Sequence, residues 1–187
     1  MIIANWKMNG TRQSVTAWIE AVSKNINVNE EKPCIFCPPT CYLDHARKLI
    51  DENEKHIKLG SQIINHNLAE DSLTGGISAN MLSDVGVEYV LIGHSEQRNL
   101  LFENNTVISN KIQKALNENL NIILCLGEDL NTKKNNATYR FIKEQLDVLR
   151  QLNLKNEAQL GSIKIAYEPI WAIGSGINAE KEYIEDI

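Results

Sequence analysis

Six short apolar runs alternate with segments of helical spacing along the chain. The runs are rich in β-branched residues and span residues 2–5, 34–38, 57–62, 87–93, 121–127 and 163–168. Runs of this kind predict buried strands. The segments between them predict helices, most clearly the first, whose apolar stripe is Val15, Trp18, Ile19, Val22 and Ile26. Apolar strands separated by helices indicate a parallel sheet covered by helices, which is an α/β fold.

Two later helices show their ends or faces in the sequence. Ser78 is a favoured capping residue, and the helix after it is expected to run through Met81, Leu82 and Val85 to a stop at Gly86. Before the last apolar run, a single apolar helix face is expected from Phe141, Val148, Leu149 and Leu152.

Six strands fit two architectures. An open doubly wound sheet would be complete at six strands, whereas a β/α barrel would be two units short. The last helix is expected to begin near Asn178–Ala179, and it reaches Ile187 without a glycine, a basic last turn or a polar tail. No linker, low-complexity tract or repeat divides the chain. We therefore expect residues 1–187 to form one incomplete domain, cut through a helix.

Composition narrows the class of protein. The chain has 187 residues, of which 43% are hydrophobic, enough for the core of one soluble domain. A formal net charge of −5 argues against a nucleic-acid partner, although a local cluster of donors could still hold a small anion. The N-terminus lacks a secretion signal, and the apolar runs are too short to span a bilayer. We expect a cytoplasmic protein without a membrane partner.

The cysteines are interpreted as core residues. Cys34, Cys37 and Cys41 have a C-x-x-C-x-x-x-C spacing, but residues three apart on a strand face opposite sides. No second cysteine or histidine pair completes a zinc site, so we expect no metal. Cys125 lies in another predicted strand, where a cysteine more often packs in the core than reacts.

Polar residues at the strand ends are the candidates for chemistry, because the carboxyl ends of barrel strands open into one mouth. These residues are Asn5, Lys7, Gln62, His94 and Glu168. They include a carboxylate, a fixed positive charge and a titratable imidazole. This set suits the abstraction of a proton from a carbon next to a carbonyl.

Each candidate also has a plainer interpretation. Glu168 could be a solvated carboxylate or a cap for the next helix, but Pro169, Trp171 and the glycines at 174 and 176 follow it. That combination is typical of a lid with hinges, whose backbone amides can approach a ligand. We call residues 169–176 the lid. G-S-G alone is a weak phosphate signal.

His94 and Lys7 are weighed in the same way. His94 could simply be hydrogen bonded at a turn, and Lys7 could be a surface lysine. The helix start at Ser95–Glu96 disfavours an imidazolium at its N-terminus, so we expect a neutral ring that donates a hydrogen bond. Lys7 lies between a strand and a helix start at Gly10–Thr11, where it is well placed to hold an anion.

Six motifs together resemble one family. They are NWKMNG at 5–10, PPTCYL at 38–43, LTGGIS at 73–78, IGHSEQR at 92–98, CLGE at 125–128 and YEPIWAIGSG at 167–176. In order and spacing, over the whole chain, they are similar to the triosephosphate isomerase family. The resemblance implies a (β/α)8 TIM barrel, of which this chain holds the first six βα units. It also implies interconversion of dihydroxyacetone phosphate and glyceraldehyde 3-phosphate through an enediolate, without a cofactor.

The resemblance assigns roles at the reacting end of the site. Glu168 matches the base that moves the carbon-bound proton, and His94 matches the electrophile that polarises the carbonyl. Asn5 and Lys7 match groups that bind the phosphorylated three-carbon sugar and steady its oxyanion, and Glu96 matches the acidic residue that organises the lysine.

The remaining implied roles lie further from the reacting atoms. Gly174 matches a lid amide that closes on the substrate phosphate, and Ser95 and Cys125 match supporting positions. The resemblance further implies a homodimer, in which the loop ending at Thr74 inserts beside Asn5 and Lys7 of the other chain.

The sequence departs from the family at several positions. Gly76 and Gln97 replace an acidic and a basic residue that the family tends to pair, and Phe102 replaces a glycine at a turn. The last two βα units, which complete the phosphate site, are missing. A catalytically impaired fragment or binding remnant is therefore the alternative function. A nucleotide-binding open sheet is less favoured, because no glycine fingerprint follows the first strand.

Overall fold

A computed structural model describes residues 1–25, 33–52, 57–65 and 73–187. Its centre is one sheet of six parallel strands in sequential order, β1-β2-β3-β4-β5-β6. Sequential order is that of a barrel, because a doubly wound sheet reverses its strand order part-way. The six predicted strands are confirmed as β1 (Ile2–Asn5), β2 (Cys34–Cys37), β3 (Ile57–Ser61), β4 (Tyr89–Ile92), β5 (Asn121–Leu126) and β6 (Ile163–Tyr167).

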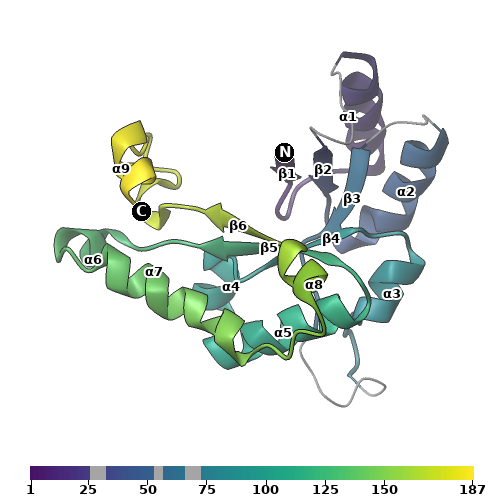
Figure 1. The fold of residues 1–187 in the computed structure, drawn as a ribbon. Helices are drawn as coiled ribbons and strands as arrows, with labels where there is room; N and C mark the ends of the chain where they lie inside the picture. The colour runs from purple at the N-terminus through teal and green to yellow at the C-terminus, as the bar shows by residue number, and fades with distance from the viewer. Residues whose placement is uncertain (26–32, 53–56, 66–72) are drawn as a thin grey trace.

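The sheet is curled, and most of the helices lie along its outer face, whereas the last helix lies beyond the end of the last strand (Figure 1). This is the arrangement of the first six βα units of a TIM barrel. The helices are α1 (Arg12–Asn25), α2 (Leu43–Glu52), α3 (Ala79–Asp84), α4 (Ser95–Leu100), α5 (Asn105–Asn117), α6 (Leu130–Lys134), α7 (Thr138–Leu146), α8 (Glu157–Gly161) and α9 (Lys181–Asp186). Three short 3-10 helices are η1 (Thr40–Tyr42), η2 (Asp147–Gln151) and η3 (Ile170–Ala172). No described helix is long and apolar enough to cross a bilayer.

The helix predictions hold with three adjustments. The α1 stripe packs as expected with Val15, Ile19 and Val22 buried, and the predicted Ile26 lies outside the described residues. The prediction of one helix with a single apolar face through Leu152 is wrong. The helix α7 ends at Leu146, and the chain continues in the tighter 3-10 helix η2. The last helix begins at Lys181, later than the expected start.

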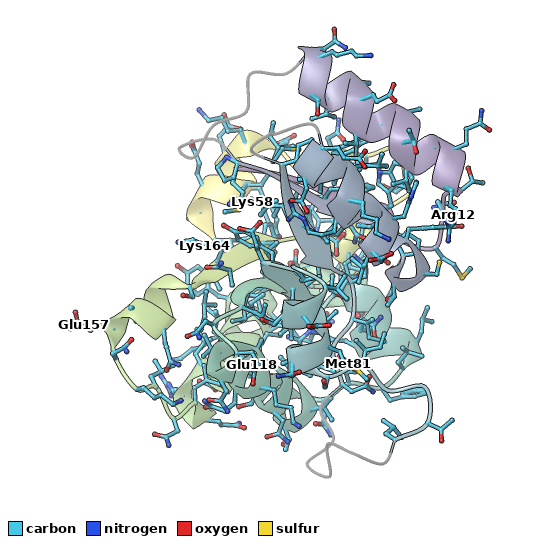
Figure 2. The ribbon with its side chains drawn as sticks, turned by 90° about the vertical axis from the view of Figure 1, so that its right-hand side faces the viewer. Arg12, Lys58, Met81, Glu118, Glu157 and Lys164 are labelled. Carbon is cyan, nitrogen blue, oxygen red and sulfur yellow. The ribbon has the colours of Figure 1, made fainter. Side chains whose placement is uncertain are left out.

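The α3 region matches its sequence signals. The Ser78 hydroxyl accepts a hydrogen bond from the Met81 N–H at 3.1 Å, and the chain turns at Gly86 with a φ of 82°. Leu82 is buried, whereas Met81, labelled in Figure 2, is 58% exposed. Phe102, where the resemblance implies a glycine, adopts a positive φ of 56°. A bulky residue in this left-handed region is strained.

Alternate residues of the strands point to opposite faces of the sheet and form two hydrophobic cores, one on each face. The larger core lies between the sheet and the helices, and includes Phe36, Leu59, Val90 and Leu124. The smaller core lines the concave face and comprises Ile35, Cys37, Leu91, Ile123 and Cys125. Burial on both faces explains why the strands read as continuous apolar runs. It also confirms that Cys34 and Cys37 are core residues. The same prediction is wrong for Cys41, which is exposed because it lies in η1, beyond the end of β2.

The two edge strands are less buried than the inner ones. β2 is buried along its whole length, whereas every residue of β6 is at least partly exposed, and Ile165 is 51% exposed. Within the described residues, β1 and β6 each pair with a single strand. Glu168, which follows β6, is therefore positioned from the β5 side.

Candidate active site

The predicted strand-end residues meet at the carboxyl edge of the sheet. Asn5 is the last residue of β1, Gln62 directly follows β3, His94 lies two residues after β4 and Glu168 directly follows β6. Because parallel strands all end on the same side, these four positions share one end of the sheet. A small cleft there is lined by Asn5, Lys7, Gln62, Leu91, His94, Glu96 and Gln97.

Lys7 is held in an unusual backbone conformation by its neighbours. Its φ is 51°, and its N–H donates to the Asn5 side-chain oxygen at 3.0 Å. The Gln62 amide donates to the Lys7 carbonyl at 3.0 Å and to the Cys37 carbonyl at 2.8 Å. The Lys7 ammonium donates to Glu96 Oε1 at 2.9 Å, as the resemblance implied. The backbone strain thus places a half-exposed positive charge at the cleft.

The position of His94 defines which ring nitrogen carries the proton. His94 caps α4, and its Nδ1 accepts a hydrogen bond from the Glu96 N–H at 3.2 Å. An acceptor nitrogen is unprotonated, so in the neutral ring the proton is on Nε2. Nε2 lies 3.4 Å from Glu168 Oε2. This distance is at the long end for an N–H···O bond, so the attraction is mainly between the ring N–H dipole and the carboxylate charge.

Glu168 is only partly enclosed. Its side chain is 31% exposed, and Oε2 accepts a hydrogen bond from the Ser95 hydroxyl at 3.3 Å. The pKa of the carboxyl is below its ordinary value: the His94 N–H lowers it most, partial burial raises it, and the charge of Lys7 and the Ser95 hydroxyl lower it further. The carboxylate is therefore ionised at neutral pH and free to accept a proton.

Three predicted residues lie outside this group. Cys125 is buried beneath the site, and burial followed by the nearby Glu168 charge raises the pKa of its thiol to about 12, although Arg98 acts in the opposite direction. It therefore remains a thiol. Gly174 is exposed, and an added Cβ there would meet no described atom within 4 Å. Thr74 is exposed in a turn, and residues 66–72 of its predicted loop lie outside the described residues.

A second carboxylate near the site was missed by sequence reasoning. Glu128 is 0% exposed and accepts hydrogen bonds from the Tyr167 hydroxyl at 3.0 Å, the Trp171 Nε1–H at 2.7 Å and the Tyr183 hydroxyl at 2.7 Å. Burial raises the pKa of both tyrosines, so their hydroxyls remain donors. The Lys133 ammonium lies 3.2 Å from the centre of the Trp171 ring. One buried carboxyl group therefore fastens the start of the lid and, through Tyr183, helix α9.

Glu128 carried only a weak sequence signal. It belongs to the CLGE motif at 125–128, but nothing in the sequence shows that three aromatic donors from β6, η3 and α9 converge on it. Among the described ranges, no group of three histidine, cysteine, aspartate or glutamate side chains could hold a metal ion.

Comparison with known proteins decides the family. The family model described as triosephosphate isomerase matches residues 1–187. The chain belongs to the triosephosphate isomerase family. Two curated relatives named triosephosphate isomerase come from Buchnera aphidicola subsp. Schizaphis graminum, 39% identical over 186 residues, and Alkaliphilus oremlandii, 37% identical over 188 residues. A third, from Vesicomyosocius okutanii subsp. Calyptogena okutanii, is 34% identical over 186 residues.

The similarity covers almost all of this chain and most of each relative. The alignments span 99% of this chain and 71% of the Buchnera isomerase, and 100% of this chain and 73% of each of the other two. The predicted family is thus confirmed. The roles of individual residues stay predictions, which the geometry above makes testable.

Proposed function

We propose that this chain carries the reacting end of a triosephosphate isomerase and interconverts dihydroxyacetone phosphate and glyceraldehyde 3-phosphate. The observation that carries the proposal is the 3.4 Å approach of Glu168 Oε2 to His94 Nε2 at the strand ends, beside Lys7 and Asn5. A base next to a hydrogen-bond donor is what an aldose–ketose isomerisation needs. The base takes a proton from carbon while the donor binds the neighbouring oxygen.

In the proposed reaction Glu168 removes a proton from the hydroxyl-bearing carbon next to the carbonyl and returns it to the former carbonyl carbon. His94 Nε2–H donates to the carbonyl oxygen and stabilises the negative charge that develops in the enediolate. The proton of the neighbouring hydroxyl passes to that oxygen, which completes the exchange. Lys7 adds a fixed positive charge, and Asn5 and Glu96 hold Lys7 through the bonds described above. The Ser95 hydroxyl holds the carboxylate at 3.3 Å, close to where it reacts.

The lid is proposed to bind the phosphate. Gly174 and Gly176 have positive φ values of 67° and 73°, which leaves their amides accessible to a ligand that approaches closely. The start of the lid is anchored by Trp171 to Glu128. We therefore propose that Gly174 reaches the phosphate by a movement of the lid about this anchor.

A homodimer in the cytoplasm completes the proposal. Large apolar side chains next to site segments are exposed, among them Met8 at 96%, Leu73 at 46% and Phe102 at 83%. A second copy of the chain would cover such side chains and bring Thr74 beside Asn5 and Lys7. Sedimentation should give a dimer, and shortening the loop before Thr74 should give monomers with poor activity. Fully active monomers would refute the role of the loop.

The alternative function is an impaired fragment or binding remnant of the same family. It is favoured by the outer edges of β1 and β6, which pair with no other strand among the described residues, and by the exposure of Gly174. Without further phosphate contacts, binding energy at the non-reacting end of the substrate is lost, and this lowers kcat as well as affinity. We expect the isolated 187-residue chain to turn over triose phosphate orders of magnitude more slowly than a complete relative.

The test is an assay of the purified chain, expressed in a host without its own isomerase. The unaltered chain should convert triose phosphate faster than a Glu168→Gln variant measured at the same concentration. Turnover equal to that of the variant would favour the binding remnant. A kcat/KM within about tenfold of a complete relative would refute the expected impairment.

A further inference from the structure

The backbone around Glu168 is attached to the end of β5. The Glu168 N–H donates to the Leu126 carbonyl at 2.7 Å, and the Ile170 N–H donates to the Glu128 carbonyl at 3.0 Å. Gly127 lies between these two acceptors. A Cβ built on Gly127 would be 1.8 Å from the Glu168 carbonyl oxygen, so the two backbones touch at this point. The orientation of the Gly127 peptides therefore sets the path of residues 168–170.

Gly127 lies one residue beyond β5, and a side chain supplies its hydrogen-bond partners. The Gly127 N–H donates to Gln145 Oε1 at 2.9 Å, and Gln145 Nε2 donates back to the Gly127 carbonyl at 3.2 Å. Gln145 lies on α7 and is 6% exposed. Its amide binds Gly127 as one more strand residue would, and both members of the pair are buried.

Gln145 and the base line a common cavity. A narrow cavity is lined by Gln145 and Gly127 together with Ser95, Cys125 and Glu168. Ser95 and Glu168 are joined by the 3.3 Å hydrogen bond of the site. Gln145 thus borders the same cavity as Glu168, whose carboxylate faces His94.

We propose that Gln145 is a positioning residue for the catalytic base, acting through Gly127. This proposal rests on the proposed function, in which Glu168 is the base. Two hydrogen bonds to one residue fix the rotation of both adjoining peptides, which a single bond or an apolar contact does not. Since proton transfer is sensitive to displacements of about 1 Å, loss of this pair should lower kcat rather than weaken substrate binding.

The chain contains a matched control for this arrangement. Gln113 on α5 makes the same two bonds to another backbone residue: its Oε1 accepts from the Asn153 N–H at 2.8 Å, and its Nε2 donates to the Asn153 carbonyl at 3.4 Å. Asn153 lies in the segment after η2 and lines none of the clefts described above. Gln145→Met and Gln113→Met therefore remove the same chemistry, and only the first should affect Glu168.

Amide hydrogen exchange in the unaltered protein and both variants is the first measurement. In Gln145→Met, exchange at the Gly127 and Glu168 amides should accelerate about tenfold or more, because both amides depend on the same backbone path. The Ile122 amide, bonded to the Ser162 carbonyl at the other end of β5, should be unchanged. Gln113→Met should accelerate exchange at the Asn153 amide and leave exchange at the Glu168 amide unchanged. Unchanged exchange at Glu168 in Gln145→Met would overturn the proposal.

The second measurement is the split between kcat and KM for triose phosphate. Gln145→Met should lower kcat about tenfold and change KM less than about twofold, and Gln113→Met should change neither. A raised KM with unchanged kcat would overturn a positioning role. Absence of turnover in the unaltered chain would refute the proposed function, and hydrogen exchange would still decide whether Gln145 positions Glu168.

A second variant covers the case in which Gln145→Met does not fold. Gln145→Glu keeps the side-chain length and the acceptor for the Gly127 N–H, and loses the donor to the Gly127 carbonyl at neutral pH. The Gly127 amide should stay protected while Glu168 exchange accelerates and kcat falls by less than in the methionine variant. Exchange and kcat equal to those of the unaltered protein would contradict the need for both bonds.

Discussion

Two carboxylates follow neighbouring strands of one sheet and have opposite surroundings. Glu128, two residues after β5, is 0% exposed, and three aromatic side chains donate to its oxygens. Glu168, directly after β6, has a side chain that is 31% exposed, and its close polar neighbours in the described part of the chain are Ser95 and His94.

The difference separates a structural carboxylate from a chemical one. Three donors hold the buried Glu128 carboxylate, two of them on Oε1 at 2.7 Å, so it cannot take a proton from a substrate without breaking the packing of β6, η3 and α9. The single Ser95 bond of Glu168 is weaker, and one side of the carboxylate is open to solvent. A carboxylate at a strand end is therefore a candidate base where its oxygens accept few hydrogen bonds, and an anchor where they accept several.

The largest expected effect is that of Glu168→Gln on turnover. Loss of the base should lower kcat about 10²–10⁴-fold with little change in KM, because a positioned general base contributes about that factor. Glu168→Asp should act in the same direction, since the shortened base is misplaced. Glu157→Gln, on the outer surface at α8 (Figure 2), is the control, and its kcat should equal that of the unaltered chain. Near-normal kcat in either Glu168 variant would remove it from the mechanism.

The second effect is that of Glu128→Gln on folding. The glutamine NH2 group would point hydrogen-bond donors at the aromatic side chains that now donate to Glu128. The free energy of unfolding should therefore fall by about 2–3 kcal/mol. Urea denaturation measures this loss. Glu144→Gln on the exposed side of α7, which breaks only the ion pair with Arg140, should cost less than about 0.5 kcal/mol. Equal stabilities for the two variants would show that the saturated carboxylate is not an anchor.

A smaller effect is expected from Tyr183→Phe. This variant removes one of the donors on Glu128, with the 2.7 Å bond, and leaves the ring that packs edge-on against Trp171. The free energy of unfolding should fall by about 1 kcal/mol, and Trp171 fluorescence should shift because its anchor has loosened. Tyr139→Phe, at a 68% exposed tyrosine of α7, is the matched control. An identical response in both variants would contradict a role for Tyr183 in fastening α9.

The smallest effect concerns the titration of Glu168. Its pKa is lowered in the folded chain, first by His94, so the carboxyl should titrate below the ordinary value of about 4.3. The stability that it contributes is complete above about pH 4.3 and is lost as the pH falls through the folded pKa. Carbon NMR of the carboxyl measures the midpoint, which His94→Gln should move upwards. A midpoint above about 4.3 in the unaltered chain would contradict the assignment of His94 as the main cause.

Local patterns predicted the strands and the polar residues at their ends well. Each of the six strands lies where a β-branched run predicted it, and α3 begins at the predicted Ser78 cap. Lys7 and His94 were found because strand-end polar residues must converge in a parallel sheet. Met81 illustrates the limit of such patterns, because a helix stripe does not show how much of each side chain its neighbours will cover.

The sequence by itself determined where the strands lie, where the helices between them lie and which residues end each strand, since these depend on periodicity, caps and short-range geometry. The order of the strands in the sheet was decided by the tertiary structure. The tertiary structure alone decided which carboxylate is saturated and what holds the base. Glu128 acquires its donors from three elements that follow it by 39 to 55 residues, and Gln145 reaches Gly127 from 18 residues away. Such contacts depend on how a helix packs against a sheet, and no short stretch of sequence contains that information.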